Sequence, residues 1–119
     1  PSQQAFDQAT PRCPKPLPLV FHGGSGSTIA ELDAAVSYGV FKMNLDTAIQ
    51  FAFAQGVGHY VLEHPVAFQH QIDPSTDKPM KSLYDPRKWL RVGEKSIVGR
   101  LDEAFEILGS KGRSVARKA

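Results

Sequence analysis

Two short polar segments, whose key residues lie 22 positions apart, carry side chains that can bind a metal ion and an anion. In the first, His22 is followed by the small residues 23–27 (Gly-Gly-Ser-Gly-Ser). An imidazole is a common metal ligand, and glycines let backbone amides point at an anion. In the second, Asn44, Asp46 and Thr47 offer an amide, a carboxylate and a hydroxyl. The pattern indicates a ligand-binding site that handles a metal and a phosphate-like group.

Each segment also has a simpler interpretation. A single histidine at a strand end is usually structural, and His22 alone cannot hold a structural zinc, which needs three or four protein ligands. The glycine/serine loop is not a nucleotide P-loop, because it lacks the Gly-Lys-Ser/Thr ending. Asp46 or Thr47 could simply cap the following helix. These alternatives stay open on the residues alone.

The surrounding sequence predicts the elements that position the two segments. Residues 19–22 and 40–43 are short apolar runs typical of buried strands. Between them Thr28 and Glu31 form a capping-box pattern, and Gly39 suits the end of that helix. The crossover of about 17 residues suits a right-handed parallel connection. In a parallel α/β fold both loops would open on one sheet edge, where such folds bind ligands.

Two further helices are expected downstream. The first runs from Thr47 to Glu63 and ends at His64-Pro65. Residues 65–83 read as a long polar connection, which is usually functional or mobile. The last helix begins at Asp85-Pro86 and ends at Gly109. The expected buried positions are Ile49, Phe53, Val57 and Tyr60 in the first helix, and Trp89, Leu90, Ile97, Leu101, Ala104, Phe105 and Leu108 in the last.

Arg87 is a third candidate for ligand binding. It follows the Asp85-Pro86 helix start, and its guanidinium fork matches phosphate oxygens. The alternative is an incidental arginine at a helix N-terminus. The remaining histidines, His59, His64 and His70, are expected to have no metal-binding role.

Composition narrows the class of protein. The 119 residues suffice for one small domain, and 41% hydrophobic with 22% charged residues is typical of a soluble globular protein. A net charge of +2 does not indicate nucleic-acid binding. No membrane-spanning run or signal peptide is expected, and Pro1 does not read as a natural start. The single Cys13 excludes an internal disulfide and fits a reducing, cytoplasmic compartment. The basic tail 111–119 is expected to be solvated.

Four segments together resemble a known family. They are residues 22–27, residues 38–40 (Tyr-Gly-Val), residues 42–47 (Lys-Met-Asn-Leu-Asp-Thr), and Tyr-Asp-Pro-Arg at 84–87 with Trp-Leu-Arg at 89–91. Their order and spacing are similar to the C-terminal third of class II, zinc-dependent fructose-1,6-bisphosphate aldolase, in its longer, dimeric subgroup. One departure is Ala48-Ile49, where the family usually has an acidic residue.

The resemblance implies an α/β fold, the C-terminal segment of a (β/α)8 TIM barrel with its last two strands and closing helices. The whole chain would then be a fragment of one barrel domain. Its parts would be a lead-in (1–18), two strand-loop-helix units (19–64), a loop (65–83), a closing helix (84–109) and a tail (110–119).

The resemblance also implies roles for residues. His22 corresponds to one of three zinc histidines, whereas the other two and the proton-transferring aspartate are expected upstream, so this segment holds no catalytic residue. Gly23, Gly24 and Ser25 resemble the site for one substrate phosphate and a monovalent cation, Na⁺ or K⁺. Further substrate contacts are implied for Asn44, Leu45, Asp46 and Thr47. Arg87 resembles the arginine that reaches the distal phosphate from the neighbouring subunit of a homodimer.

The implied activity of the complete protein is reversible cleavage of fructose 1,6-bisphosphate to dihydroxyacetone phosphate and glyceraldehyde 3-phosphate through a zinc-stabilised enediolate. The partner is thus a small sugar bisphosphate, with no nucleic acid and no membrane. The 119-residue chain alone is expected to be inactive. The alternatives are an aldolase acting on tagatose 1,6-bisphosphate, a non-catalytic phosphate-binding module, and an inactive fragment that assembles with a missing N-terminal chain.

Overall fold

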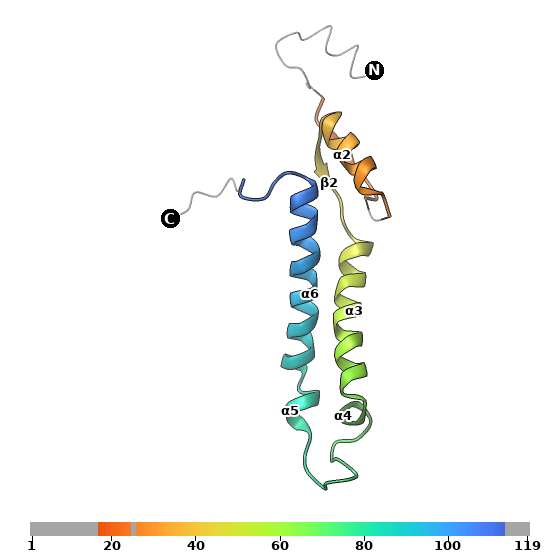
Figure 1. Ribbon diagram of the computed structural model, residues 1–119, viewed down its shortest axis with the longest axis vertical. Coiled ribbons are helices and arrows are strands. Elements are labelled where there is room, and N and C mark those ends of the chain that lie inside the picture. Colours follow the sequence, from red (N-terminus) through yellow and green to blue (C-terminus); the bar gives the residue numbers. More distant parts are fainter. Residues whose placement is uncertain (1–16, 25, 114–119) are drawn as a thin grey trace. The chain divides into compact units, whose positions relative to one another are not determined.

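The computed structural model describes residues 17–24 and 26–113. The chain divides into two compact units, which we describe separately. Unit 1 comprises residues 1–46 and 103–119, and unit 2 comprises residues 47–102. The elements follow in the order β1, α2, β2, α3, α4, α5 and α6 (Figure 1). The sequence of Ser2 to Gln8 predicts the end of a helix, but these residues and Cys13 lie outside the described residues.

Unit 1 contains the predicted strand-helix-strand motif. Strand β1 (Leu19–Phe21) pairs in parallel with β2 (Val40–Met43), and helix α2 (Ile29–Ser37) connects them. The pairing sets Leu19 against Val40 and Phe21 against Met43, with an irregularity after Leu19. The predicted parallel connection is therefore confirmed, and His22 is the first residue beyond β1.

The predicted capping box fixes the start of α2. The amide of Thr28 donates to Glu31 Oε2 over 2.7 Å, and the amide of Glu31 donates to Thr28 Oγ1 over 3.3 Å. These bonds stabilise the charged carboxylate, so hydrogen bonding from Thr28 lowers the pKa of Glu31. At the other end Gly39 has φ +105°, a left-handed conformation that costs glycine least, and β2 begins at the next residue.

The expectation that both strands are buried is wrong for this chain. Val20 of β1 is 38% exposed and Phe41 of β2 is 69% exposed. A parallel sheet is buried only when helices cover both of its faces. Among the described residues of unit 1, α2 is the one complete helix, so much of the strand surface stays open.

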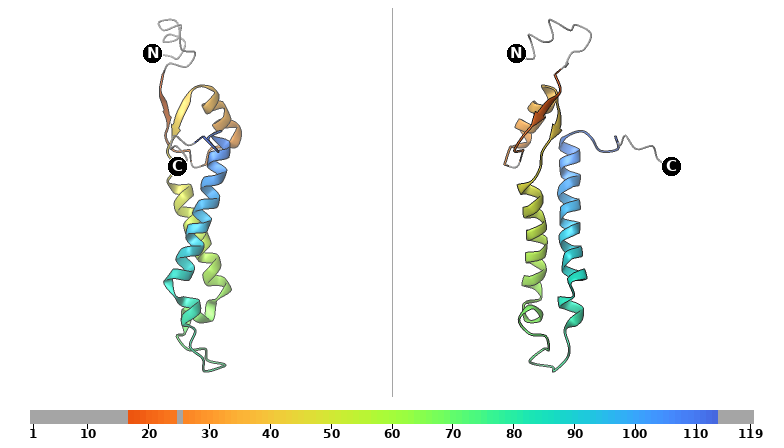
Figure 2. Two further views of the ribbon diagram at one scale, coloured as in Figure 1. Left: turned by 90° about the vertical axis from the view of Figure 1, so that its left-hand side faces the viewer. Right: turned by 180° about the vertical axis from the view of Figure 1, so that it is seen from behind.

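Unit 2 is a helical hairpin. Helix α3 (Thr47–Glu63) and α6 (Pro86–Ile107), whose residues up to 102 belong to this unit, lie side by side and run in opposite directions (Figures 1 and 2). The predicted bounds of α3 are confirmed, as is the start of α6 after Asp85. Beyond α6, the Ser110 amide donates to the Phe105 carbonyl over 2.9 Å, which is the glycine-containing C-cap expected at Gly109.

The two long helices approach closely at two glycines. A Cβ atom on Gly56 would lie 2.8 Å from Ser96 Cβ, and one on Gly93 would lie 2.5 Å from the Phe53 ring. At the same crossing Ser96 Oγ donates to the Ala52 carbonyl over 2.6 Å. Only residues without a large side chain allow this approach.

This crossing corrects the expected core of α3. The four predicted core residues, Ile49, Phe53, Val57 and Tyr60, are only half-buried, whereas the buried residues are Ala52 and Gly56. Glycine in a helix interior ordinarily weakens the helix. In the structure, Gly56 is the point at which the partner helix packs.

The connection at 65–83 is more ordered than expected. It contains α4 (Pro65–Gln69) and most of α5 (Lys81–Tyr84), with an isolated bridge between Ile72 and Pro79. The reason lies partly in Pro65, whose fixed φ suits the first turn of a helix as well as the end of one. Ala67 and Met80 are buried, at 5% and 8% exposure, although the sequence offered no periodic apolar pattern there.

No helix among the described residues has both the length and the apolar character needed to cross a membrane.

Candidate active site

The loop after β1 has the geometry that its glycines allow. Gly23 adopts φ +74°, which a side chain would strain, and it faces open space. Gly24 is buried, and a Cβ there would lie 2.5 Å from Met43 Sδ, so a side chain at this position would require the Met43 side chain to move. Ser25 lies outside the described residues. The chain can therefore pass close to the end of β2 without a side chain in the way.

His22 and Asn44 meet where the two strands end. The Asn44 amide donates to the Phe21 carbonyl over 3.1 Å, which continues the strand pairing by one residue. This places the Asn44 side chain beside the imidazole, with 3.0 Å between Asn44 Nδ2 and His22 Nδ1. Two segments separated by 22 residues thus converge, as expected for loops at one edge of a parallel sheet.

The other residues of the second segment follow Asn44 along the chain towards α3. Leu45 is half-buried and Asp46 is exposed, and both still belong to unit 1. Thr47 is exposed and is the first residue of α3 in unit 2. The structure therefore brings together His22 and Asn44, whereas Asp46 and Thr47 stand at the start of the next element.

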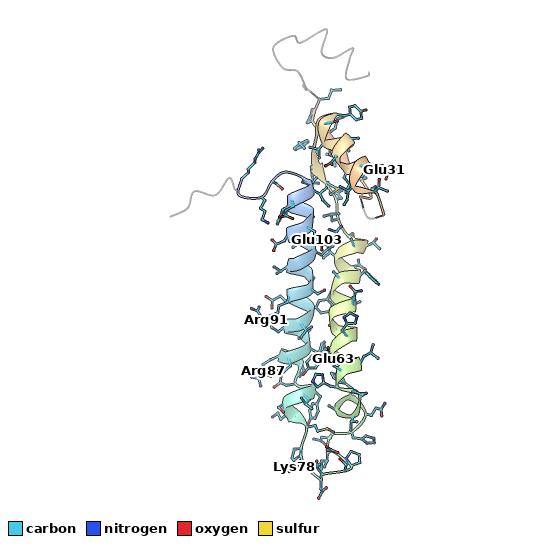
Figure 3. All side chains as sticks on the ribbon, viewed as in Figure 1. Glu31, Glu63, Lys78, Arg87, Arg91 and Glu103 are labelled. Carbon is cyan, nitrogen blue, oxygen red and sulfur yellow. The ribbon has the colours of Figure 1, made fainter. Side chains whose placement is uncertain are left out.

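The N-terminus of α2 already has an acidic partner. Glu31, which is labelled in Figure 3, lies on this helix. Its carboxylate accepts from the backbone amide and the hydroxyl of Thr28, over 2.7 and 2.9 Å. The Glu31 carboxylate would therefore repel an anion that approached the first turn of α2.

Arg87 lies in unit 2 at the start of α6. Its Nη2 lies 2.6 Å from Asp85 Oδ2, and its Nε lies 3.0 Å from Asp85 Oδ1. These hydrogen bonds and the adjacent positive charge lower the pKa of Asp85 to about 2, and the carboxylate in turn raises the pKa of Arg87. The Arg87 side chain is 87% exposed, so it is accessible to a ligand while Asp85 orients it.

A basic pocket surrounds Arg87 within unit 2. It has a volume of about 600 Å³ and is lined by Tyr60, Asp85, Arg87, Lys88, Arg91, Val92 and Lys95. Arg87 and Arg91 project from the same side of α6 (Figure 3). Of these basic residues, the sequence motif pointed to Arg87 alone. The spacing of 87, 91 and 95, four residues apart on a helix, is the signal that could have found the others.

The described residues do not form a complete metal site. Among residues 17–24 and 26–113, no three histidine, cysteine, aspartate or glutamate side chains gather closely enough to hold a metal ion. His64 has a structural environment, since its ring stacks on Tyr60 with 4.4 Å between centroids and its Nδ1 lies 2.9 Å from the Tyr60 carbonyl. His22 can supply one imidazole ligand and needs others from outside these residues.

Comparison with known proteins decides the family. Residues 3–113 match the family described as "Fructose-bisphosphate aldolase class-II". The chain belongs to the class II fructose-bisphosphate aldolase family. It is 53% identical over 96 residues to a fructose-bisphosphate aldolase of Campylobacter jejuni, covering 79% of this chain and 27% of the relative. To the class 2 enzyme of Escherichia coli K12 it is 47% identical over 96 residues, with the same coverage.

A solved structure supports the same assignment. The 1.85 Å crystal structure of the Campylobacter jejuni aldolase is similar to this chain with a TM-score of 0.86 and 48% identity. The similarity covers 91% of this chain and 32% of that one. The expected fold class, a segment of a class II aldolase barrel, is thereby confirmed. The chain spans between a quarter and a third of the length of these aldolases.

Proposed function

We propose that the complete protein containing this chain is a class II aldolase that reversibly cleaves fructose 1,6-bisphosphate to dihydroxyacetone phosphate and glyceraldehyde 3-phosphate. Family membership supports the reaction class. The observation that supports a role for these residues is that His22 and Asn44 converge at the strand ends, beside the glycine loop. This is where a parallel β/α fold collects ligand-binding groups.

His22 is proposed as one zinc ligand. Its imidazole is exposed at the end of β1, and a neutral imidazole nitrogen is a ligand that Zn²⁺ accepts. When bound, zinc polarises the substrate carbonyl and stabilises the negative charge that cleavage leaves on the three-carbon fragment. The remaining ligands and the proton-transferring aspartate belong to parts of the protein outside this chain. No catalytic residue is assigned within it.

The glycine loop is proposed to hold the phosphate nearer the zinc. Gly23 and Gly24 supply backbone without side chains, and Ser25 supplies a hydroxyl. A monovalent cation, Na⁺ or K⁺, would share the charge of that phosphate. Asn44, Leu45, Asp46 and Thr47 are proposed to contact the sugar chain. Such contacts serve catalysis by fixing the position of the reacting carbons, which reduces the entropic part of the barrier.

Arg87 is proposed to bind the distal phosphate, across the interface of a homodimer. A guanidinium has five N–H donors, and Asp85 engages the edge formed by Nε and Nη2. Donors on Nη1 remain on the exposed side for phosphate oxygens. The basic residues around Arg87 give the pocket a positive field that favours a bisphosphate. We place the protein in the cytoplasm, in glycolysis and gluconeogenesis.

The test uses the complete protein. Its metal is removed with a chelator, and cleavage of fructose 1,6-bisphosphate is measured before and after addition of Zn²⁺. We expect activity to disappear on removal and return with Zn²⁺, and fructose 1,6-bisphosphate to be preferred over tagatose 1,6-bisphosphate. Preference for the tagatose sugar would transfer the proposal to that substrate. Phosphate binding without any turnover would replace it with a non-catalytic binding role.

A further inference from the structure

A row of four basic side chains follows about two turns of α6 within unit 2. Arg87, Lys88, Arg91 and Lys95 are all exposed, and all four line one pocket of about 600 Å³. Arg87 and Arg91 project from the same side of the helix (Figure 3). An α-helix rises about 1.5 Å per residue, so the row extends about 12 Å along the axis. One phosphate on Arg87 therefore leaves the far end of the row open to a second anionic group.

The two lysines of this row leave positive charge unbalanced in the pocket. Each arginine has a carboxylate beside it, which is Asp85 for the first, while Nη1 of Arg91 lies 2.6 Å from Glu94 Oε2. Among residues 17–24 and 26–113, no carboxylate lies within ion-pair distance of Lys88 or Lys95. The pocket thus carries an excess of two positive charges, and these belong to side chains that the chain itself does not pair.

The rest of the lining suits a small molecule. The volume falls within the range of small-molecule sites. Tyr60 and Val92 are half-buried and form the less polar part of the wall, and the Tyr60 hydroxyl already donates to the Leu83 carbonyl over 2.7 Å. Charges that line a cleft with such walls attract opposite charge more strongly than charges on an open surface. A net charge of +2 gives the chain no general attraction for nucleic acid.

We propose that this pocket binds a small polyanion with adjacent phosphate groups, of the class of tripolyphosphate. One phosphate group contacts Arg87, and the next groups contact Arg91 and Lys95 further along α6. A guanidinium binds phosphate through parallel hydrogen bonds, and an ammonium adds a point charge. Orthophosphate fills only one of these positions, so it gains only part of the binding energy.

The polyanion then shares Arg87 with the sugar bisphosphate. This step rests on the proposed function, in which Arg87 binds the distal phosphate, whereas binding of the polyanion itself does not rest on it. Two ligands that need the same guanidinium exclude each other. The polyanion is therefore an inhibitor that competes with fructose 1,6-bisphosphate.

The first experiment measures binding by titration calorimetry on the complete protein, after removal of its metal so that zinc does not bind the probe. At one ionic strength, tripolyphosphate should bind at least about tenfold more tightly than orthophosphate, because it makes further charged contacts. Lys95→Ala and Arg91→Gln should each weaken tripolyphosphate binding about tenfold and orthophosphate binding much less. Lys78→Ala removes the same charge from an exposed lysine outside the pocket and should leave both affinities unchanged.

The calorimetry gives a decision for each outcome. Equal affinities for the two phosphates would overturn the inference, because the pocket would then hold a single anion. An equal loss in Lys78→Ala would also overturn it, because any positive charge would then suffice. Lys95 forms no ion pair with the described residues, so Lys95→Ala should fold as the wild type does, and the test does not depend on Arg91→Gln.

The second experiment measures inhibition of fructose 1,6-bisphosphate cleavage by tripolyphosphate. Inhibition should be competitive, and Lys95→Ala should raise the inhibition constant about tenfold. Equal inhibition of the wild type and Lys95→Ala would come from removal of zinc by the probe and would overturn the competition. Binding in the calorimeter by a protein without turnover would leave the polyanion site standing and refute the proposed aldolase activity, so the two failures are distinguishable.

Discussion

At the scale of single residues, Asp85 both caps α6 and orients Arg87. Its Oδ1 accepts from the Arg87 backbone amide over 3.0 Å, while Oδ2 accepts from Nη2 of the same residue over 2.6 Å. A guanidinium held in one orientation loses less freedom when it binds a phosphate. The pair therefore links a local capping interaction to the proposed recognition of the distal phosphate.

Removal of Arg87 should separate the two halves of the reaction. Arg87→Ala is expected to raise KM for fructose 1,6-bisphosphate about 10- to 100-fold, the usual effect of losing a hydrogen bond to a charged group. Proton exchange on dihydroxyacetone phosphate should change much less, because that compound has no distal phosphate. Arg87→Lys should fall between, since lysine binds phosphate as a point charge. Equal losses in both assays would mean that Arg87 stabilises the fold or acts at the zinc end of the site, and not on the distal phosphate.

The Asp85–Arg87 pair also predicts an acid-sensitive contribution to stability. The folded-state pKa of Asp85, about 2, is below its ordinary value of 3.8, so the pair stabilises the fold fully above pH 3.8. The contribution is lost as pH falls from 3.8 towards 2. Thermal midpoints of the complete protein and Asp85→Asn should differ by a constant amount above about pH 5 and converge towards pH 2. A difference that widens on acidification would contradict this assignment.

The sequence predicted the location of the candidate site better than its chemistry. That His22 and Asn44 lie at one sheet edge follows from the strand-helix-strand pattern. Their hydrogen bond does not, because it depends on a strand register with an irregularity after Leu19. The capping-box pattern in the sequence predicted that the Glu31 carboxylate lies at the start of α2. The effect of this carboxylate on an approaching anion could be argued only from the geometry of the loop.

At the scale of elements, the close crossing of α3 and α6 depends on glycine. Gly56→Ala would set a methyl group 2.8 Å from Ser96 Cβ and 3.1 Å from the Val92 carbonyl, and overpacking of this kind costs about 1–3 kcal/mol. Gly58→Ala, on the same helix, meets nothing within 4 Å and should stabilise the helix by up to about 1 kcal/mol.

Thermal midpoints of the two variants in the complete protein should therefore move in opposite directions. Gly56→Ala should lower the midpoint and Gly58→Ala should raise it. A rise in both would mean that the helices separate at low cost. A fall in both would show that helix propensity does not control this segment.

Helix starts were predictable because their signals are local. Thr28 with Glu31, and Asp85 with Pro86, cap their helices with side chains that lie within a few residues of each other. The short helices α4 and α5 were missed because they have no apolar periodicity, and their order depends on contacts that bury Ala67 and Met80. The burial of the strands was overestimated. Strands of a parallel sheet are buried only when further layers cover them, and the described elements do not supply those layers.

At the scale of the whole molecule, the described residues bury little apolar surface. The buried hydrophobic residues are Leu32, Ala52, Ala67, Met80 and Ala104, and most of these are small. Large side chains stay exposed in both units, including Tyr38 at 70% and Leu62 at 76%. The chain spans 27% of the length of its Campylobacter jejuni relative, so the cover for these surfaces is expected from the rest of that fold.

The isolated 119-residue chain is therefore expected to lack a cooperative thermal transition and to cleave no fructose 1,6-bisphosphate. The two parallel strands found among residues 17–24 and 26–113 cannot close a barrel, and no further strand of these residues pairs with their outer edges. Circular dichroism during heating and a coupled cleavage assay would measure both properties. Addition of the remaining part of the protein as a separate chain should restore both. Cooperative unfolding together with turnover from the chain alone would contradict this expectation.

The measurement that tests the central claim most directly is the zinc content of the complete protein with and without His22. Wild-type protein should hold one Zn²⁺ per subunit and cleave fructose 1,6-bisphosphate, and His22→Ala should lose the metal and the activity together. His59→Ala, which removes an exposed histidine of α3, is the control and should keep both. Stoichiometric zinc in His22→Ala would contradict the account.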